Sequence, residues 1–268
     1  MKLATQSPQQ QLLGLYEKSP LKKAKFAAIE ELLPDTSGMV CLDIGADNGV
    51  LSYLLRQRGG KWHSADLDGD VVAAIKNMVG DRVHQFDGGP TEFPDDYFDL
   101  IVIIDFLEHI EDDSGFIEEL SRIMKPGGVL IVNVPHYKGR SPIRRLRLAV
   151  GLTDDKHGHV RPGYTMDSLA GTLLPNFIVE KRQTYSRFFV ELFDVAVSWY
   201  LDRAKHGDSS RKGNVVTAHD MSTHRKQFKL YSLIYPLVWC LGQADRLLFF
   251  TSGYSLVVRA RASAEATS

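Results

Sequence analysis

Two runs of apolar residues, LIVII at 100–104 and VLIVNV at 129–134 with one asparagine, limit most strongly what this chain can fold into. Strands that are apolar on both faces are typical of a parallel sheet covered by helices on each side. Shorter apolar segments precede and follow these runs at regular intervals. The strands we expect are 39–44, 61–66, 82–86, 99–105, 129–135, 177–184 and 254–262. The pattern therefore predicts an α/β fold with a mostly parallel sheet and helices on both faces.

Segments with helical periodicity alternate with these strands. We expect helices at about 8–33, 50–58, 70–78, 114–124 and 165–174. The sequence KPGG at 125–128 is expected to close the fourth of them, with lysine in the last turn and glycine after it.

The last two expected strands are separated by about 70 residues, although a short connection would join them. This stretch contains two apolar-rich helical segments, 186–204 and 227–250, with a polar segment between them. We therefore expect a helical insertion that acts as a cover. The expected organisation is an N-terminal helical segment, a core, the insertion, and a last core strand with the tail, at 1–37, 38–185, 186–252 and 253–268.

Composition excludes several classes. The 32 Lys and Arg nearly balance the 33 Asp and Glu, so no overall field selects nucleic acid. Only two cysteines occur, which indicates a reducing compartment rather than a disulfide framework. The N-terminus lacks the apolar core of a secretory signal, and the longest uncharged apolar run is too short to span a bilayer. We expect a cytoplasmic protein. The alternative is a cytoplasmic protein that contacts a membrane peripherally through the insertion.

A glycine turn, GADNG at 45–49, follows the first expected strand and opens a helix. A dinucleotide-binding turn would have glycine where Asp47 stands, and aspartate there would repel a pyrophosphate. A cofactor without phosphate but with positive charge suits Asp43 and Asp47 better. S-adenosylmethionine, with a sulfonium, an ammonium and a carboxylate, is such a molecule.

Acids recur at the ends of the following strands. Asp66 ends the second strand, where an acid can accept hydrogen bonds from ribose hydroxyls, and Asp87 ends the third. The segments EFPDDYFD, FLEHI and KPGG then follow in order. In this order the sequence resembles the class I S-adenosylmethionine-dependent methyltransferases, over residues 38 to about 182. The resemblance implies a Rossmann-like, seven-stranded sheet in which the strand 254–262 is antiparallel to its neighbours.

The resemblance also implies a set of cofactor contacts. The glycine turn would contact the methionine part, Asp66 the ribose and the 86–88 loop the adenine, while the end of the fourth strand would line the methionyl end. The positions carried over are Asp43, Gly45, Ala46, Asp47, Gly49, Asp66, Leu67, Phe86, Asp87, Gly88, Asp105 and Phe106. Asp47 departs from the commoner glycine of the family and leaves the backbone path there open.

Catalytic candidates lie on the loops after the fourth and fifth strands, because open α/β sheets bind ligands at the carboxyl ends of their strands. They are Glu108, His109, His136, His157, His159, Arg161 and Tyr164. His159 and Tyr164 resemble a segment that covers the substrate in many such enzymes. We select His109, His159 and Tyr164 as the catalytic residues. For His109, packing or hydrogen bonding is the favoured alternative, and helix capping and solvation account equally well for the 159–165 loop.

A metal interpretation stays open as an alternative. Some quinone O-methyltransferases and small-RNA 2′-O-methyltransferases bind a divalent ion through Glu and His near this location. Asp105, Glu108, His109 and His136 are suitable ligand types. Adjacent residues such as Glu108 and His109 need not converge, however, so we expect no metal.

The methyl acceptor is the least determined feature. The apolar insertion favours a small-molecule acceptor that is hydrophobic or lipid-linked, with O-methylation expected. The basic segment 138–147 would suit anionic headgroups or a substrate phosphate, and an RNA acceptor is its rival. A protein acceptor and a binding module that has lost turnover are the remaining alternatives. The sequence does not determine the oligomeric state.

Overall fold

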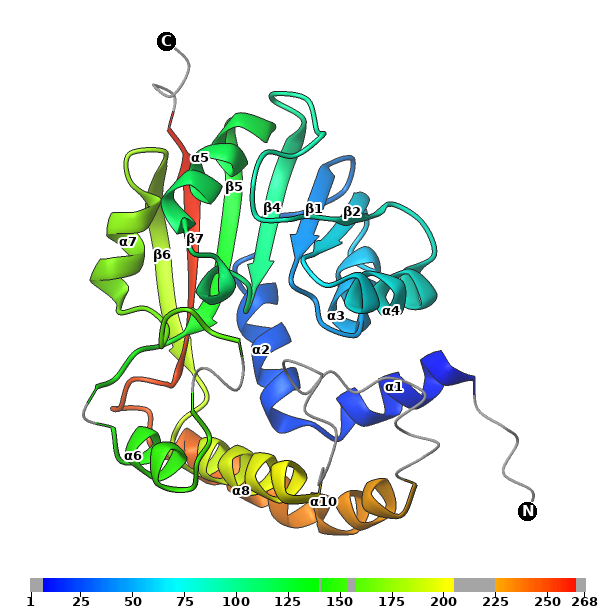
Figure 1. Ribbon diagram of the computed structural model, residues 1–268, viewed down its shortest axis with the longest axis vertical. Helices are drawn as coiled ribbons and strands as arrows, with labels where there is room; N and C mark the ends of the chain where they lie inside the picture. Colours follow the sequence, from blue (N-terminus) through cyan, green and yellow to red (C-terminus); the bar gives the residue numbers. More distant parts are fainter. Residues whose placement is uncertain (1–6, 140, 154–157, 205–224, 264–268) are drawn as a thin grey trace.

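The computed structural model describes residues 7–139, 141–153, 158–204 and 225–263. Its centre is one seven-stranded sheet in the order β3-β2-β1-β4-β5-β7-β6 (Figure 1). The strands are β1 Val40–Ile44, β2 Lys61–Asp66, β3 Val83–Gln85, β4 Phe98–Ile104, β5 Met124–Pro135, β6 Phe177–Tyr185 and β7 Ser255–Ala262.

The first five strands pair in parallel, whereas β7 pairs antiparallel with both β5 and β6. The predicted α/β class, the seven-stranded sheet and the antiparallel last strand are therefore confirmed. Strand order reverses between β1 and β4, and in open α/β sheets ligands bind outside the carboxyl ends of the strands at such a point.

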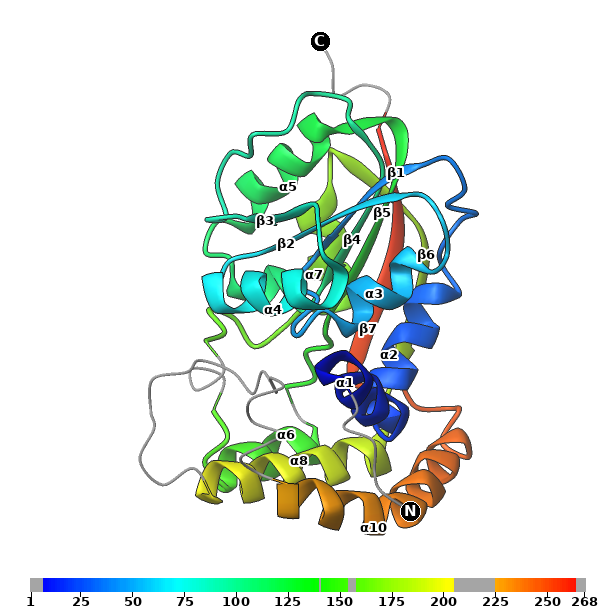
Figure 2. The ribbon, with the colours of Figure 1, turned by 90° about the vertical axis from the view of Figure 1, so that its right-hand side faces the viewer.

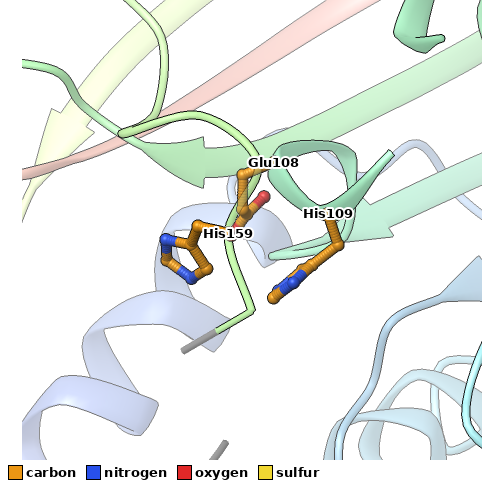
Figure 3. Close-up of side chains that lie close together, drawn as sticks. All are labelled: Glu108, His109 and His159. Atoms are coloured by element: carbon orange, nitrogen blue, oxygen red, sulfur yellow. The ribbon is translucent and has the colours of Figure 1, made fainter. Parts of the chain in front are cut away.

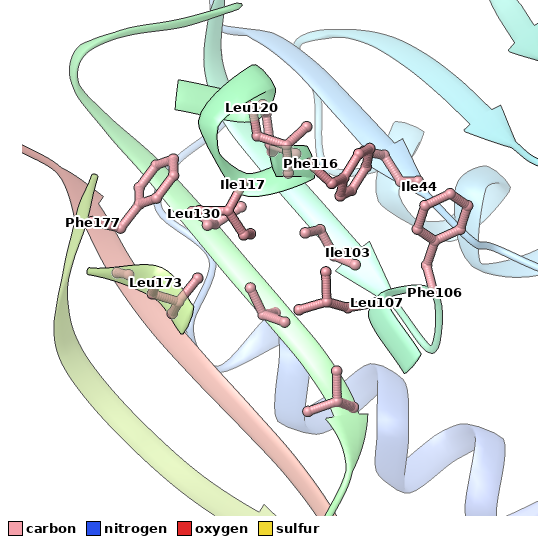
Figure 4. Packing of buried hydrophobic residues seen from close by; sticks show 14 of the residues in the cluster. Ile44, Ile103, Phe106, Leu107, Phe116, Ile117, Leu120, Leu130, Leu173 and Phe177 are labelled. Atoms are coloured by element: carbon pink, nitrogen blue, oxygen red, sulfur yellow. The ribbon is translucent and has the colours of Figure 1, made fainter. Parts of the chain in front are cut away.

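Helices cover both faces of the sheet (Figure 2). The helices are α1 Pro8–Glu17, α2 Pro20–Glu30, α3 Val50–Arg56, α4 Gly69–Val79, α5 Asp113–Ile123, α6 Pro142–Ala149, α7 Met166–Leu173, α8 Phe188–Ala204 and α10 Arg225–Arg246, with a 3-10 turn η1 at Leu107–His109. Helices α5 and α7 bury their apolar sides against one face (Figure 4). Helices α1, α2 and α3 cover the other.

Three predicted boundaries are wrong. The N-terminal segment is two helices, because Ser19 caps a new helix that begins at Pro20. KPGG does not close a helix: α5 ends at Ile123, and the sequence lies inside β5, which already pairs with β4 at Met124. The last insertion helix ends at Arg246, and residues 247–250 form turns instead.

The helices α6, α8 and α10 form a layer beyond the carboxyl ends of β1 and β4 (Figure 1). Helix α8 packs on α6 and α10, and α2 lies between this layer and the sheet. Asp245, near the end of α10, accepts hydrogen bonds from the backbone N–H groups of Arg187 and Phe189, at 2.8 and 2.7 Å. A carboxylate there satisfies amides that a helix start leaves unpaired, so it joins α10 to α8. Among the described residues, no helix is both long and apolar enough to cross a membrane.

Candidate active site

The glycine turn lies at the point of strand-order reversal, and its shape is imposed by the protein itself. Gly45 has φ 84°, and a Cβ there would lie 2.3 Å from the carbonyl oxygen of Ile104. At Gly49, with φ 82°, a Cβ would lie 2.9 Å from the backbone of Ile75 in α4. Both positions therefore require glycine for close packing of the core. A substitution at Gly45 would disturb the fold before it tested any ligand.

Asp43 lies behind the turn. Its side chain has no exposed surface, and its two carboxylate oxygens accept hydrogen bonds from the Oγ atoms of Ser52 and Ser64, at 2.5 and 2.8 Å. Burial raises the pKa of Asp43 to about 6, against these hydrogen bonds. We therefore propose that Asp43 holds β1, β2 and α3 together beneath the cofactor position, rather than pointing at the ligand.

Two other acids of this edge are paired with lysines of α2. Asp47, with φ 57°, forms an ion pair with Lys22 at 2.9 Å. Asp105, with φ 46°, forms one with Lys25. Burial alone would lower the pKa of Lys25, but the carboxylate of Asp105 raises it, and the lysine stays charged. The edge therefore carries both signs of charge side by side.

The pair of Lys25 and Asp105 continues into the sheet. Asn133 of β5 donates from Nδ2 to Asp105 at 2.8 Å, and the hydroxyl of Tyr185 donates to the side-chain oxygen of Asn133 at 2.7 Å. No motif in the sequence singles out Lys22, Lys25, Asn133 or Tyr185. The three-residue spacing of the two lysines, which puts them on one side of a helix, is the signal that was available.

The nucleoside side of the edge is more open. Asp66 is half-buried at the end of β2, where burial raises its pKa to about 6, and the backbone N–H of Asp68 donates to Oδ1 at 3.3 Å. Leu67 is half-buried beside it. Asp87 is exposed and accepts from the N–H of Gly89 at 2.9 Å, which shapes the 86–88 loop. These positions stay predictions for ribose and adenine contacts.

Four of the predicted contact residues are placed so that they would act through the backbone. The side chains of Ala46, Phe86 and Phe106 are almost fully buried. The ring of Phe106 packs at 5.4 Å from that of Phe116 in the core. Gly88 has φ 89° and lies against Ile110 and Leu67. We propose that these residues shape the site walls.

Glu108, His109 and His159 come together beside the end of β4 (Figure 3). One ligand atom from each lies within 4.8 Å of the others. Glu108 is 1% exposed, and neither carboxylate oxygen has a hydrogen-bond partner among the described residues. Burial, and then the charge of Asp105, raise the pKa of Glu108 well above its usual value. Such an unpaired buried carboxyl is costly, which is typical of a functional position.

His109 has a defined tautomer. Its Nδ1 lies 3.0 Å from the carbonyl oxygen of Gly158, which can only accept, so Nδ1 carries the proton. In the neutral ring the lone pair is then on Nε2. The ring of His159 meets the ring of His109 edge-on, with centroids 4.8 Å apart. The two predicted histidines thus share one site, with a nitrogen lone pair that can accept a proton or hold a cation.

Tyr164 is 3% exposed and fastens the loop that carries His159. Its hydroxyl donates to Asp113 at 2.7 Å and accepts from Arg161 at 2.6 Å. Burial and the bond to Asp113 raise the pKa of Tyr164 well above its usual value. Its backbone N–H also donates to Pro135 at 2.9 Å. This geometry favours a positioning role for Tyr164 over proton transfer.

Of the four residues considered as metal ligands, only Glu108 and His109 come together. Asp105 is paired with Lys25, and Nδ1 of His136 donates to the carbonyl of Gly253 at 2.8 Å. His159 takes their place beside Glu108 and His109, which do converge. This group of one carboxylate and two imidazoles has the donor types of a divalent transition-metal site. His157 lies outside the described residues.

A family model described as "Methyltransferase domain" matches residues 18–173, more than half of the chain. The chain belongs to this family. The predicted membership of the class I methyltransferases, the predicted enzyme class and the predicted S-adenosylmethionine cofactor are thereby confirmed. The match ends at residue 173, so α8 and α10 of the helical layer lie outside it, whereas α6 lies within it.

The methyltransferase is similar to a ubiquinone biosynthesis O-methyltransferase of Nitrosomonas europaea, with 27% identity over 128 residues, which are 45% of this chain and 53% of the relative. The chain thus spans about half the length of that relative. Its fold is similar to that of the cyclase SpnF, with a TM-score of 0.58 and 17% identity over 89% of this chain and 80% of the other. It is also similar to the N-methyltransferase NodS of Bradyrhizobium japonicum WM9, solved with S-adenosylhomocysteine, with a TM-score of 0.52 and 13% identity over 92% and 90%.

The donor set fits the cofactor of the family. S-adenosylmethionine has a carboxylate, an ammonium and a sulfonium at one end and ribose hydroxyls at the other. The lysines Lys22 and Lys25 and the acids Asp47 and Asp105 match the charged end, and Asp66 matches the ribose. We propose that these groups bind the two ends of the cofactor.

Proposed function

We propose that this methyltransferase methylates an oxygen of a small hydrophobic or lipid-linked acceptor. The observation that carries the proposal is the helical layer of α6, α8 and α10 beyond the carboxyl ends of the strands (Figure 1). Helix α2, which bears Lys22 and Lys25, contacts both α8 and α10. A layer so close to the cofactor edge suits an apolar acceptor, because it excludes water from the reaction. The named activity of the ubiquinone relative supports the same acceptor class.

Bound S-adenosylmethionine supplies a methyl group that its sulfonium activates. We assign Lys22 and Lys25 to the carboxylate of the cofactor, and Asp66 to the ribose. An acceptor hydroxyl must lose its proton as its oxygen is methylated. We assign that proton to Nε2 of His109, whose tautomer leaves this atom unprotonated. Glu108 and His159 complete the group on this side of the cofactor position.

The proposal is tested by methyl transfer to paired acceptors. Catechols or hydroquinones with and without a polyprenyl chain are incubated with S-adenosylmethionine whose methyl group carries an isotope label. We expect label on an oxygen of the product, with kcat/KM at least tenfold higher for the chained acceptor, because apolar burial favours it. Equal transfer to both members of each pair would remove the hydrophobic-acceptor assignment.

The same protein preparation distinguishes a methyltransferase from a module that binds the cofactor without turnover. Cofactor binding measured by calorimetry together with no labelled product from any quinol, RNA or protein fraction would favour that alternative. The fold alone does not decide the matter, since a cyclase has a similar one. Labelled RNA or labelled protein would in turn replace the small-molecule acceptor.

A further inference from the structure

A turn between α10 and β7 presents apolar side chains outward. We name residues 246–252, with the sequence RLLFFTS, the apolar tip. Leu247, Phe249 and Phe250 are 73%, 78% and 74% exposed. They are the most exposed large apolar side chains among the described residues. Single exposed hydrophobic residues are ordinary, but three within four positions indicate a contact surface.

The tip is held in place rather than frayed. The N–H of Leu247 donates to Ala244 at 3.0 Å, and that of Thr251 donates to Leu248 at 2.9 Å. On its far side, the N–H of Gly253 donates to the hydroxyl of Thr184 at 2.9 Å. The turn therefore starts from the end of α10 and returns directly to the sheet. Its side chains stay exposed because the backbone fixes them there.

Cations lie at both ends of the tip. Arg246 is exposed within it, Nζ of Lys138 donates to the carbonyl of Ser252, and Nε of Arg187 donates to that of Thr251 at 3.2 Å. The tip contains no acid, and the acid that precedes it, Asp245, is 6% exposed and turned to the amides of α8. Apolar side chains between positive groups are complementary to a surface with anionic headgroups above hydrocarbon.

We propose that the apolar tip docks the methyltransferase on an anionic lipid bilayer, with Leu247, Phe249 and Phe250 inserted and Arg246, Lys138 and Arg187 at the headgroups. The charges favour a bilayer over a protein partner, because positive groups lie at both ends of a turn whose apolar side chains are exposed. This inference rests on the proposed function only in one respect: the benefit of docking would be access to a lipid-linked acceptor. No helix in the described part of the chain is long and apolar enough to span the bilayer in this mode.

The tip is also connected to the active-site edge. Gly253, the residue after it, accepts a hydrogen bond from His136, which follows the carboxyl end of β5 at Pro135. A Cβ at Gly253 would lie 2.0 Å from the carbonyl of Tyr185, so the chain passes tightly against the end of β6 here. Docking through the tip would therefore hold the strand ends toward the membrane surface, where a lipid-linked acceptor is available.

Vesicle flotation of the full chain tests the proposal, with no cofactor or acceptor present. The vesicles are phosphatidylcholine alone and phosphatidylcholine with a quarter phosphatidylglycerol. We expect binding to the anionic vesicles, and a partition coefficient at least tenfold lower for the F249S/F250S variant. The R246Q variant should lose about fivefold on anionic vesicles and little on neutral ones. High salt should reproduce the loss.

The matched control is L174S/I178S: Leu174 is the C-cap residue of α7, Ile178 lies near the start of β6, and their side chains are 57% and 59% exposed. It should bind vesicles like the parent. Parent-level binding by F249S/F250S would overturn the proposal, as would a parent that stays unbound on both vesicle types. A change from dimer to monomer in F249S/F250S without vesicle binding would assign the tip to a second copy of the chain. Methyl transfer to a soluble acceptor is measured separately, so loss of docking and loss of the proposed function remain distinguishable.

Discussion

Lys25 of α2 forms an ion pair with Asp105, which lies 80 positions later at the carboxyl end of β4. The pair brings the N-terminal helices to the point where strand order reverses. Asn133 and Tyr185 extend it into β5 and β6. Four segments far apart in the sequence thus converge on the position where the methionine part of the cofactor would lie.

Removal of the lysine charge should weaken cofactor binding. For Lys25→Ala we expect the Kd for S-adenosylhomocysteine to rise by about 10- to 100-fold, the range of a charge-assisted hydrogen bond. Calorimetry measures this, with Lys25→Arg as the partial rescue. The control is Lys23→Ala, because Lys23 is exposed and pairs only with Glu17 among the contacts described. Unchanged affinity in Lys25→Ala would exclude the assignment.

Proton acceptance by His109 predicts a rate effect without a binding effect. His109→Gln should lower kcat by about 100-fold or more, while the Kd for S-adenosylhomocysteine stays within twofold. His136→Gln is the control, since its ring is bonded to Gly253. Dialysis against EDTA separates the two uses of the same nitrogen. Unchanged activity agrees with the base, and a loss that Mn²⁺ or Zn²⁺ restores would instead assign Glu108, His109 and His159 to a cation.

Asp43 and Asp66 should each lower the free energy of unfolding as pH rises from about 4 to 6, against the opposing contribution of His63, whose pKa burial lowers to about 4. Burial raises the pKa of Asp43 and of Asp66 from 3.8 to about 6, so the folded state holds protons that the unfolded state has released in this window. The contribution of Asp43 is present below pH 4 and is lost as pH passes 6, at a cost of about 3 kcal/mol. Urea unfolding across this range measures it. Asp43→Asn should remove the contribution of Asp43 to the pH dependence of the unfolding free energy. An unchanged pH dependence in that variant would show that Asp43 is not its source.

The joint between α10 and α8 depends on one carboxylate. Asp245→Ala removes the acceptor for the N–H groups of Arg187, Phe189 and Val190 and should cost about 1 to 2 kcal/mol of unfolding free energy. Hydrogen exchange at the first turn of α8 should become faster, while exchange in β4 stays unchanged. Asp245→Asn keeps one acceptor and should be intermediate. If hydrogen exchange instead became faster to the same degree throughout the chain, the substitution would destabilise the whole fold and not only the contact between α10 and α8.

The sequence by itself determined the sheet and the family. Continuous apolar runs such as β4 and β5 have few alternatives to burial on both faces, and the order of the glycine turn, Asp66 and LEH is local information. Local patterns also place Thr165 as the cap of α7. They were less informative at KPGG. Its glycines and lysine predict a helix end there, but pairing of Met124 with β4 already begins the strand β5 before this sequence.

Only the tertiary structure decided which side chains face the site. Asp43 and Phe106 are in site motifs, yet the packing of α3 and α5 turns them into the core. Lys22 and Lys25 are outside every motif, yet the path of α2 places them at the strand ends. Glu108 and His159 meet because Tyr164 and Arg161 fix a loop 50 residues downstream. Such relations depend on contacts between distant segments, which periodicity and spacing along the chain do not encode.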